Sequence, residues 1–411
     1  MKNWGRKKIV DISNIFEDGD WIESKDQSAE GIRLIQTGNV GNGIFKDRGE
    51  KARYISEDTF KKLRCTEIFE GDCLVSRLPD PVGRACILPD TGEKMITAVD
   101  CTIIRFDQKQ LLSNWFLYYS LSNEYQNEIQ KQVTGATRQR ISRKNLGLVS
   151  VPLPPLPEQQ RIVSILDETF AAIAKAKANA EQNLKNAKEL FESYLQGVFE
   201  KKGDGWEVRK VKDIGYAQTG TTPKTAEKEN YGDFIPFIKP ADVDFSGIGD
   251  IRYDNEGLSE IGLKKGRKIE SGSILMVCIG ATIGKVGFAE REVSCNQQIN
   301  SLSVKNEFEP KFIYYAMTSR EFQVKVLLEG KGAQATLPII NKSKWENLTI
   351  SFPNSKNEQH TIVRQLDALR AETQKLEAVY QKKMADLEEL KKSILQKAFA
   401  GELKTEKAMA V

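Results

Sequence analysis

Histidine is nearly absent from this chain of 411 residues, and its scarcity narrows the chemistry that the protein can perform. The one histidine, His360, stands where a related stretch has Gln160, which favours a surface residue over a ligand or a base. General bases are most often histidines, and structural zinc sites need several His or Cys ligands at short spacing. The six cysteines include no C-x-x-C pair. We therefore expect no histidine-based catalysis, no zinc site, and buried free thiols.

Long apolar runs are also missing. No segment reaches the ~18 consecutive apolar residues of a membrane-spanning helix, and the N-terminal sequence MKNWGRKKIVDIS lacks the apolar core of a signal peptide. With 40% hydrophobic and 29% charged residues, the chain has a soluble, globular composition, and we expect it in the cytoplasm. The net charge of +4 permits nucleic acid as a partner without arguing for it. The length predicts two to three domains.

Motifs that would support catalysis fail when their spacing is counted. The stretch GATIGKV at residues 280–286 has three residues between its glycines and Val after Lys, whereas a phosphate-binding loop needs four and a Ser or Thr. Pro79-Asp80 and Glu93-Lys94 are spaced too loosely for a metal-dependent nuclease and have no counterpart in the second half. Asp80-Pro81-Val82-Gly83 lacks an aromatic residue to stack on a target base. The sequence thus predicts a protein without catalytic residues, metal or cofactor.

One long stretch of the sequence occurs twice. Residues 158–199 and 358–399 align at a constant offset of 200, and both begin with EQxxIVxxLD and end with SxLQxxF. Both lack proline and are rich in the helix formers Ala, Leu, Glu, Lys and Gln. Each is predicted to be one helix of ~60 Å, which is far longer than an ordinary globular helix. Such a helix separates two parts of a protein or binds a partner along its length.

Apolar residues recur every seven positions in both predicted helices, from Leu166 in the first and from Leu366 in the second. This spacing keeps a seam facing a partner helix. A second track contains one step of eight, from Ala176 to Leu184, and the same step recurs 200 residues later. We therefore expect the two helices to pair with each other, because two helices of one bundle core would leave the period of 200 unexplained. The predicted seam contains Ile162, Leu166, Ile173, Leu184, Phe191, Ile362, Leu366, Leu376, Leu387 and Ile394.

The repeat extends into the segments before each helix. Three pairs of segments correspond: IRLIQTGNV (32–40) with IPFIKPADV (235–243), EGDCLVSR (70–77) with ESGSILMV (270–277), and Gly83-Arg84 with Gly284-Lys285. The second pair predicts a turn followed by a buried strand in each half. Proline-containing linkers, VPLPPLPEQQ and SFPNSKNEQ, lead into the helices.

These features divide the chain into two globular units and two helices. The expected ranges are a first unit at 1–156, a helix at 157–202, a second unit at 203–356, a helix at 357–402 and a tail at 403–411. The predicted fold class is α/β (α+β), with two globular domains separated by two long antiparallel helices, a coiled coil, and an internal pseudo-twofold repeat.

The repeated helix starts and ends, with two dissimilar units before them, resemble the specificity subunit of a type I restriction-modification system over nearly the whole chain. TGTTPK from Thr219 and YGDFIPFIK from Tyr231 match the opening of many target-recognition domains in that family. The loops that begin at Gly135 and Gly332 match their closing segment. The helix pair is the most specific of these signals.

The resemblance implies a DNA-binding subunit without catalytic activity inside a hetero-oligomeric complex for DNA modification and restriction. Each globular unit would be a target-recognition domain that reads one half of a bipartite, asymmetric site on double-stranded DNA. The helices would bind methyltransferase subunits, two being expected, to which motor-nuclease restriction subunits attach. Those partners would bind the methyl donor, ATP and Mg²⁺, and no membrane is involved. A twofold arrangement sets two reading heads about one helical turn, or ~34 Å, apart on the duplex.

The predicted DNA face is the set of polar loops in each unit. Arg and Gln can form paired hydrogen bonds with guanine and adenine, whereas Lys and Thr more often hold phosphates. In the first unit the candidates are Gln36, Thr37, Asn39, Arg77, Arg138, Gln139, Arg140, Arg143 and Lys144. In the second unit they are Thr219, Thr221, Lys224, Lys239, Lys285, Gln334, Thr336 and Lys342. The closing loop is basic in the first unit (TRQRISRK) and mostly neutral in the second (QATLPIINK), so we expect the units to read unlike sequences.

Two other classes of protein share parts of this pattern. A coiled-coil adaptor or scaffold without DNA specificity would share the helices, and salt-dependent binding to a defined split sequence would exclude it. A self-sufficient nuclease or methyltransferase would share DNA binding, and it would need activity in the purified chain alone.

Overall fold

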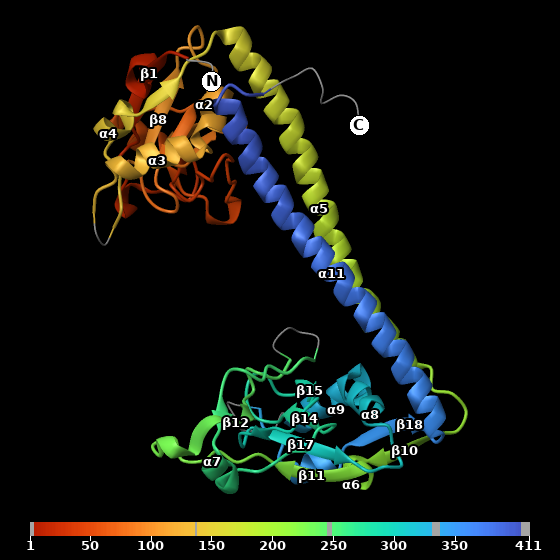
Figure 1. Cartoon of the computed structure of the whole chain (residues 1–411). Helices are drawn as coiled ribbons and strands as arrows, with labels where there is room; N and C mark the ends of the chain where they lie inside the picture. Colours follow the sequence, from red (N-terminus) through yellow and green to blue (C-terminus); the bar gives the residue numbers. More distant parts are fainter. Residues whose placement is uncertain (1–3, 136–137, 245–248, 331–337, 404–411) are drawn as a thin grey trace. The chain divides into compact units, whose positions relative to one another are not determined.

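The computed structural model describes residues 4–135, 138–244, 249–330 and 338–403, and the chain divides into two compact units. Unit 1 comprises residues 1–181 and 382–411, and unit 2 comprises residues 182–381. The two predicted long helices are α5 (Leu156–Glu200) and α11 (Lys356–Phe399) (Figure 1). Each unit thus holds a globular part, the start of one long helix and the end of the other. In the described part of the chain, no helix combines the length and the apolar character needed to cross a membrane.

The described residues of unit 1 form three sheets. The four-stranded sheet has the order β2 (Ser13–Asp18), β8 (Cys101–Phe106), β5 (Cys73–Ser76) and β6 (Ala85–Ile87), and all neighbours are antiparallel. The three-stranded sheet has the order β4 (Tyr54–Ile55), β3 (Ile32–Ile35) and β7 (Met95–Thr97), with β3 parallel to β7. β1 (Arg6–Lys8) pairs with β9 (Ser150–Pro152). The helices of its globular part are η1 (Ile9–Ile12), η2 (Ser24–Asp26), η3 (Gly49–Lys51), α1 (Glu57–Leu63), α2 (Ser113–Ser120), α3 (Asn123–Gln132) and α4 (Arg143–Leu148).

Unit 2 repeats this topology strand for strand. Its four-stranded sheet has the order β11 (Gly215–Thr219), β17 (Ile299–Val304), β14 (Ile274–Val277) and β15 (Val286–Phe288). Its three-stranded sheet has the order β13 (Gly257–Leu258), β12 (Tyr231–Ile238) and β16 (Ser294–Cys295), and β10 (Trp206–Lys210) pairs with β18 (Thr349–Pro353). The helices of its globular part are α6 (Val211–Ile214), η4 (Lys228–Asn230), α7 (Glu260–Lys265), α8 (Pro310–Thr318), α9 (Arg320–Gly330) and α10 (Lys342–Glu346). The predicted α/β fold class with an internal repeat is confirmed.

The core of each unit contains the buried strand that the sequence predicted, β5 in unit 1 and β14 in unit 2. Every residue of both strands is buried. All six cysteines are free and buried, as expected. Burial raises the pKa of Cys65, to about 11, so its thiol stays protonated at neutral pH. These thiols therefore act as small apolar side chains in the packing.

The repeated helix motifs supply the last part of each core. In unit 1, Leu166 of α5 packs in one cluster with Leu395 and Phe399 from the end of α11. In unit 2, Leu366 of α11 packs in one cluster with the equivalent residues from the end of α5, Leu195 and Phe199. The ring of Phe399 lies 4.8 Å from Trp115, and the ring of Phe199 lies 5.5 Å from Phe312. The identical residues of the repeat thus do the same packing in both units.

The glutamine of the EQxxIV motif joins each helix start to its unit. Gln159 is fully buried, and its amide accepts a hydrogen bond from the Leu112 backbone N–H (3.0 Å) while donating to the carbonyl of Pro154 (2.8 Å). Gln359 repeats the pattern with the N–H of Glu309 and the carbonyl of Pro353, both at 2.9 Å. A buried amide satisfied on both sides fixes where each helix begins.

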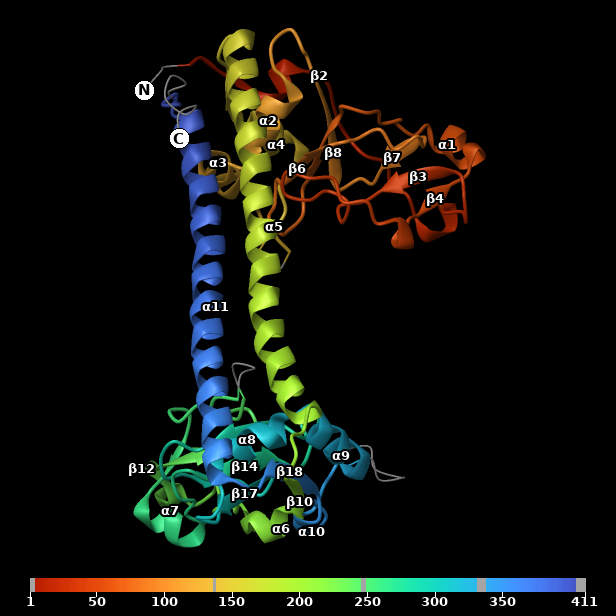
Figure 2. The ribbon, with the colours of Figure 1, turned by 90° about the vertical axis from the view of Figure 1, so that its right-hand side faces the viewer.

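The long helices run antiparallel within each unit. In unit 1, Leu166 of α5 packs with Leu395 and Phe399 of α11. Eleven residues later in α5, Lys177 pairs with Glu388 (2.6 Å), which comes earlier in α11 than Leu395. In unit 2, Lys188 pairs with Glu377 (3.9 Å), and Tyr194 lies 3.2 Å from Gln365. The segments of both helices lie side by side in each unit (Figure 2).

The seam prediction holds least well near the step of eight. Ile162, Leu166 and Ile173 are buried, and Leu366 is fully buried. The other predicted seam residues are half-buried, namely Leu184, Phe191, Ile362, Leu387 and Ile394. Leu376 is a correction, because 41% of it is exposed. It is the residue from which the step of eight begins, and the extra residue turns that position away from the partner helix.

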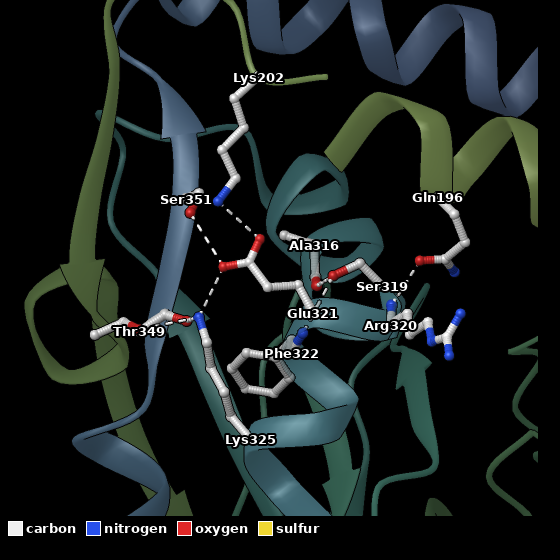
Figure 3. Close-up of polar contacts among 10 residues, drawn as sticks. All are labelled: Gln196, Lys202, Ala316, Ser319, Arg320, Glu321, Phe322, Lys325, Thr349 and Ser351. Carbon is white, nitrogen blue, oxygen red and sulfur yellow. Dashed lines mark hydrogen bonds and ion pairs between the residues drawn. The ribbon is translucent and has the colours of Figure 1, made fainter. Parts of the chain in front are cut away.

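A polar junction joins the end of α5 to the globular part of unit 2 (Figure 3). The amide oxygen of Gln196 accepts a hydrogen bond from the first backbone N–H of α9, that of Arg320, at 2.7 Å. The carboxylate of the next residue, Glu321, lies 2.9 Å from the ammonium groups of Lys202 and Lys325. The segment that leaves α5 is therefore attached to α9 by charge as well as by packing.

Candidate nucleic-acid interface

One end of each four-stranded sheet gathers the polar loops of its unit. In unit 1, β2 and β5 end where β8 and β6 begin, so Asp18, Arg77, Arg84 and Asp100 lie at the same sheet end. In unit 2 the same end carries Thr219, Cys278, Lys285 and Gln298. We name these regions the sheet end of unit 1 and the sheet end of unit 2.

Matching backbone hydrogen bonds show that the two sheet ends are equivalent. The N–H of Arg77 donates to the carbonyl of Asp100 (2.9 Å), and the N–H of Cys278 donates to the carbonyl of Gln298 (2.8 Å). The closing segments dock in the same way, because Ile141 donates to the carbonyl of Arg77 (3.2 Å) and Ile340 to that of Cys278 (2.9 Å). Arg77 therefore occupies the position of Cys278, and Asp100 that of Gln298.

The sheet end of unit 1 is built on five charged residues, which we call the arginine–aspartate cluster: Asp18, Arg77, Asp100, Arg140 and Arg143. Arg77 lies 3.4 Å from Asp18 and 3.8 Å from Asp100. Arg140 lies 2.8 Å from Asp100, and Arg143 lies 3.9 Å from Asp18. Burial lowers the pKa of Arg77, which Asp18 offsets in part, and the guanidinium remains charged because its ordinary pKa is so high. With three cations and two anions, the cluster has a net charge of +1.

Two predicted DNA contacts in unit 1 are corrected by burial. The side chain of Arg77 is 5% exposed, and its guanidinium donates to the carbonyl of Val99 (2.6 Å) beneath the surface. Asn39 is 8% exposed, and its amide bonds the N–H of Gln36 (2.9 Å) and the carbonyl of Lys46 (3.0 Å). Both side chains hold backbone in place rather than facing solvent.

The remaining candidates of unit 1 reach the surface to different degrees. Gln36 and Thr37 are half-buried, and their loop is tied to the sheet end because Arg84 donates to the carbonyls of Thr37 (2.8 Å) and Val40 (2.6 Å). The exposed candidates are Arg138, Gln139, Arg140, Arg143 and Lys144. The closing loop is therefore the most accessible basic part of this sheet end.

The sheet end of unit 2 is dominated by hydroxyl and amide groups. Thr219 donates to the amide oxygen of Asn300 (2.8 Å), which is 2% exposed, and Thr222 donates to the amide oxygen of the exposed Gln297. Thr221 and Lys285 are half-buried. Gln334 and Thr336 lie outside the described residues.

The other predicted lysines of unit 2 have acidic or carbonyl partners. Lys239 pairs with Glu256 (2.6 Å), and Lys224 pairs with Glu227 (3.6 Å). Lys342 lies 3.3 Å from Glu346 and donates to the carbonyl of Ala217 (3.2 Å). This sheet end thus offers less unbalanced positive charge than the sheet end of unit 1.

Sequence reasoning missed Asp18, Asp100 and Gln297. Asp18 could have been found from the internal repeat, because it occupies the position in unit 1 that the candidate Thr219 occupies in unit 2. Among the residues that the structure describes, no group of three or more His, Cys, Asp or Glu is arranged to hold a metal ion. His360 lies at the start of α11, with its Nδ1 3.0 Å from Glu309.

Comparison with known proteins agrees with this architecture. The type I restriction modification DNA specificity domain matches twice, at residues 1–185 and 203–383, and the chain therefore belongs to that family. Among relatives, the type I restriction enzyme EcoBI specificity subunit of Escherichia coli is 25% identical over 72% of this chain and 67% of its own length.

Two solved structures share the fold. One comes from work on complex assembly and conformational transition of the type I R-M system, with a TM-score of 0.78 and 18% identity over 98% of this chain and 99% of that chain. The other is the HsdS subunit of Thermoanaerobacter tengcongensis, with a TM-score of 0.62 and 17% identity over 98% of both chains.

Proposed function

We propose that the chain is the sequence-specific DNA-binding subunit of a type I restriction-modification complex and recognises a bipartite, asymmetric target. The observation that carries this proposal is the pair of equivalent sheet ends with unlike side chains, in a chain that matches the specificity family twice. Equivalent backbones present their loops in the same way, and unlike side chains read unlike bases.

The chain itself supplies recognition, and other subunits supply chemistry. Its long helices would bind methyltransferase subunits, two being expected, and motor-nuclease subunits would join through them. The methyl donor, ATP and Mg²⁺ would be bound by those partners. In support, the family match is to a DNA specificity domain, and the relatives are named as specificity subunits of restriction enzymes.

The direct test is to map methylated adenines in the host genome with and without the gene. We expect one split sequence to lose methylation when the gene is removed, and expression of the gene with its methyltransferase to restore it. If the same adenines stay methylated without the gene, the chain does not direct the methyltransferase.

A second test separates recognition from catalysis. The purified chain should bind the mapped duplex with an affinity that falls steeply as salt rises, because basic groups displace counterions from phosphates. It should transfer no labelled methyl group and cut no DNA until partner subunits are added. Methyl transfer by the chain alone would contradict the proposal.

A further inference from the structure

The side chain of Arg140 is fixed from two directions at the sheet end of unit 1. Its backbone exchanges two hydrogen bonds of 2.9 Å with Thr134, and the next residue, Ile141, is buried. Its Nη2 lies 2.8 Å from Oδ1 of Asp100, while 47% of the side chain remains exposed. A guanidinium has five N–H donors, so this contact leaves other donors available to a ligand.

The position of Asp100 is fixed in turn by Arg77. The N–H of Arg77 donates to the carbonyl of Asp100 (2.9 Å), and the buried guanidinium lies 3.8 Å from its carboxylate. Asp100 is 23% exposed, between a cation that is buried and a cation that faces solvent. The carboxylate is thus placed by its backbone and by ion pairs rather than by hydrogen bonds, since its Oδ1 has no hydrogen-bond partner among the described residues, and it can orient Arg140 through charge.

We propose that Asp100 is a positioning residue that aims Arg140 at a guanine in the first half of the DNA target. This inference rests on the proposed function and names one base class that unit 1 reads. Guanine is the base that fits, because its major-groove edge presents two acceptors, O6 and N7, to a group that only donates. Adenine presents one donor there, which a guanidinium cannot satisfy.

At the equivalent described positions of unit 2, this arrangement is not repeated. Cys278 stands in place of Arg77, Gln298 in place of Asp100 and Ile339 in place of Arg140. An aliphatic side chain makes no paired hydrogen bonds with a base edge. At this position of the sheet end, the orientation of an arginine by a carboxylate is thus a feature of unit 1, and its loss should leave the second half-site unaffected.

The test is the Asp100→Asn variant of the full chain, assayed for binding to the mapped target and to duplexes in which each guanine of the first half-site is replaced in turn. In the wild type, one guanine should be preferred about tenfold or more over its replacement. In Asp100→Asn this preference should fall towards unity, while binding to unrelated DNA stays equal or becomes tighter because the net charge rises by one. Glu30→Gln is the control, since it makes the same charge change at an exposed residue.

Discrimination in the second half-site reports in the same assay whether the variant is folded. If Asp100→Asn also loses discrimination in the second half-site, the variant is not properly folded, and Arg140→Lys becomes the test of the inference. Lysine keeps the positive charge but cannot make the paired contact with guanine. Arg140→Lys should lose the guanine preference at unchanged affinity for unrelated DNA.

An undiminished guanine preference in a folded Asp100→Asn variant, or in Arg140→Lys, would overturn the inference. Equal weakening on every duplex in Arg140→Lys would also do so, because it would make Arg140 a phosphate contact. A wild-type chain that discriminates no split sequence would instead contradict the proposed function itself.

Discussion

The sheet ends of the two units have the same backbone and different chemistry. In both, the strand order, the turn at Gly83 or Gly284 and the docking of the closing segment are the same. The sheet end of unit 1 holds a buried arginine between two carboxylates, whereas the sheet end of unit 2 holds a buried cysteine beside amides and hydroxyls.

This difference teaches where such a fold can vary. The strands behind each sheet end are buried and packed, so a change there costs core stability. At the sheet end the polar side chains pair with one another, and two different arrangements are present in one chain. A buried cation needs nearby anions, which explains why Asp18 and Asp100 accompany the buried Arg77.

The largest effect should come from removing the second globular unit and the second long helix altogether. A half-chain of residues 1–202 lacks Leu395 and Phe399, which complete the core of unit 1, but it retains the equivalent Leu195 and Phe199. We expect it to form an antiparallel twofold dimer that recognises a palindromic split site built from the first half-sequence. Light scattering measures whether the half-chain dimerises. Methylation mapping with the methyltransferase present identifies the site that the dimer recognises.

The control for this prediction is the half-chain with Leu195→Ala and Phe199→Ala. Each truncation should cost about 2–5 kcal/mol of core packing, which is enough to leave a monomer. The unmodified half-chain should pair less tightly than the native helices, because Ala180 replaces the half-buried Tyr380. A dimer of the half-chain that recognised an asymmetric site would contradict the antiparallel pairing.

The next effect should appear in one half-site only. Replacing Arg138 and Arg140 with Ala removes two exposed guanidinium groups from the closing loop of unit 1. We expect a loss of about 1–3 kcal/mol in binding for each paired base contact, confined to the first half-site. Binding to duplexes substituted in either half measures this. Equal weakening on all duplexes would mean that both residues hold phosphates, and an unchanged affinity would place the DNA face elsewhere.

Substitutions at the helix starts should destabilise both units. Gln159→Ala and Gln359→Ala each leave a backbone N–H and a proline carbonyl without their partner, which costs about 1–3 kcal/mol for each unsatisfied group. Gln159 also donates to the carbonyl of Gln110 (2.9 Å), so Gln159→Ala should be the more costly of the two. Urea unfolding measures the two variants side by side. The exposed Gln160→Ala is the control and should change stability little. A larger loss in Gln359→Ala than in Gln159→Ala would contradict this ranking.

Periodicity and repetition made the architecture predictable. Gln159 and Gln359, or Phe199 and Phe399, could be matched from sequence alone because an identical residue at a fixed offset implies the same packing. The position of Leu376 was wrong because a heptad count does not say how a step of eight turns the helix.

The composition of the sheet end was harder to predict. Arg77 was assigned to the surface by its charge. Its partners Asp18 and Asp100 lie far from it in sequence, so the sequence did not reveal that they would pair with it. Such pairing depends on strand register, which a charge pattern does not specify. The sites of DNA contact therefore remain a prediction in both units.

The smallest effect should come from the polar junction at the start of α9, where the units again differ. Glu321 interacts with Lys202 and Lys325 (Figure 3). The equivalent Glu124 of α3 instead pairs with Arg6 at 2.5 Å. Burial acts to raise the pKa of Glu321, but the hydrogen bonds from Lys325 and Lys202 outweigh it, so the pKa lies below its ordinary value. Its contribution to stability is then fully present above the ordinary pKa of a glutamate and is lost as pH falls towards the folded-state value.

We therefore expect Glu321→Gln to reduce the free energy of unfolding at pH 7 and to have less effect at about pH 3, below the ordinary glutamate pKa. Because the pairs are partly exposed, the loss at neutral pH should be only about 0.2–1 kcal/mol for each ion pair. Urea unfolding of the variant and the wild type at both pH values gives the difference directly. Lys202→Met, which removes one of the two cations, should give a smaller loss with the same pH dependence. A deficit that grew as the pH fell would show that the carboxylate is destabilised in the folded chain, and that burial outweighs the two lysines.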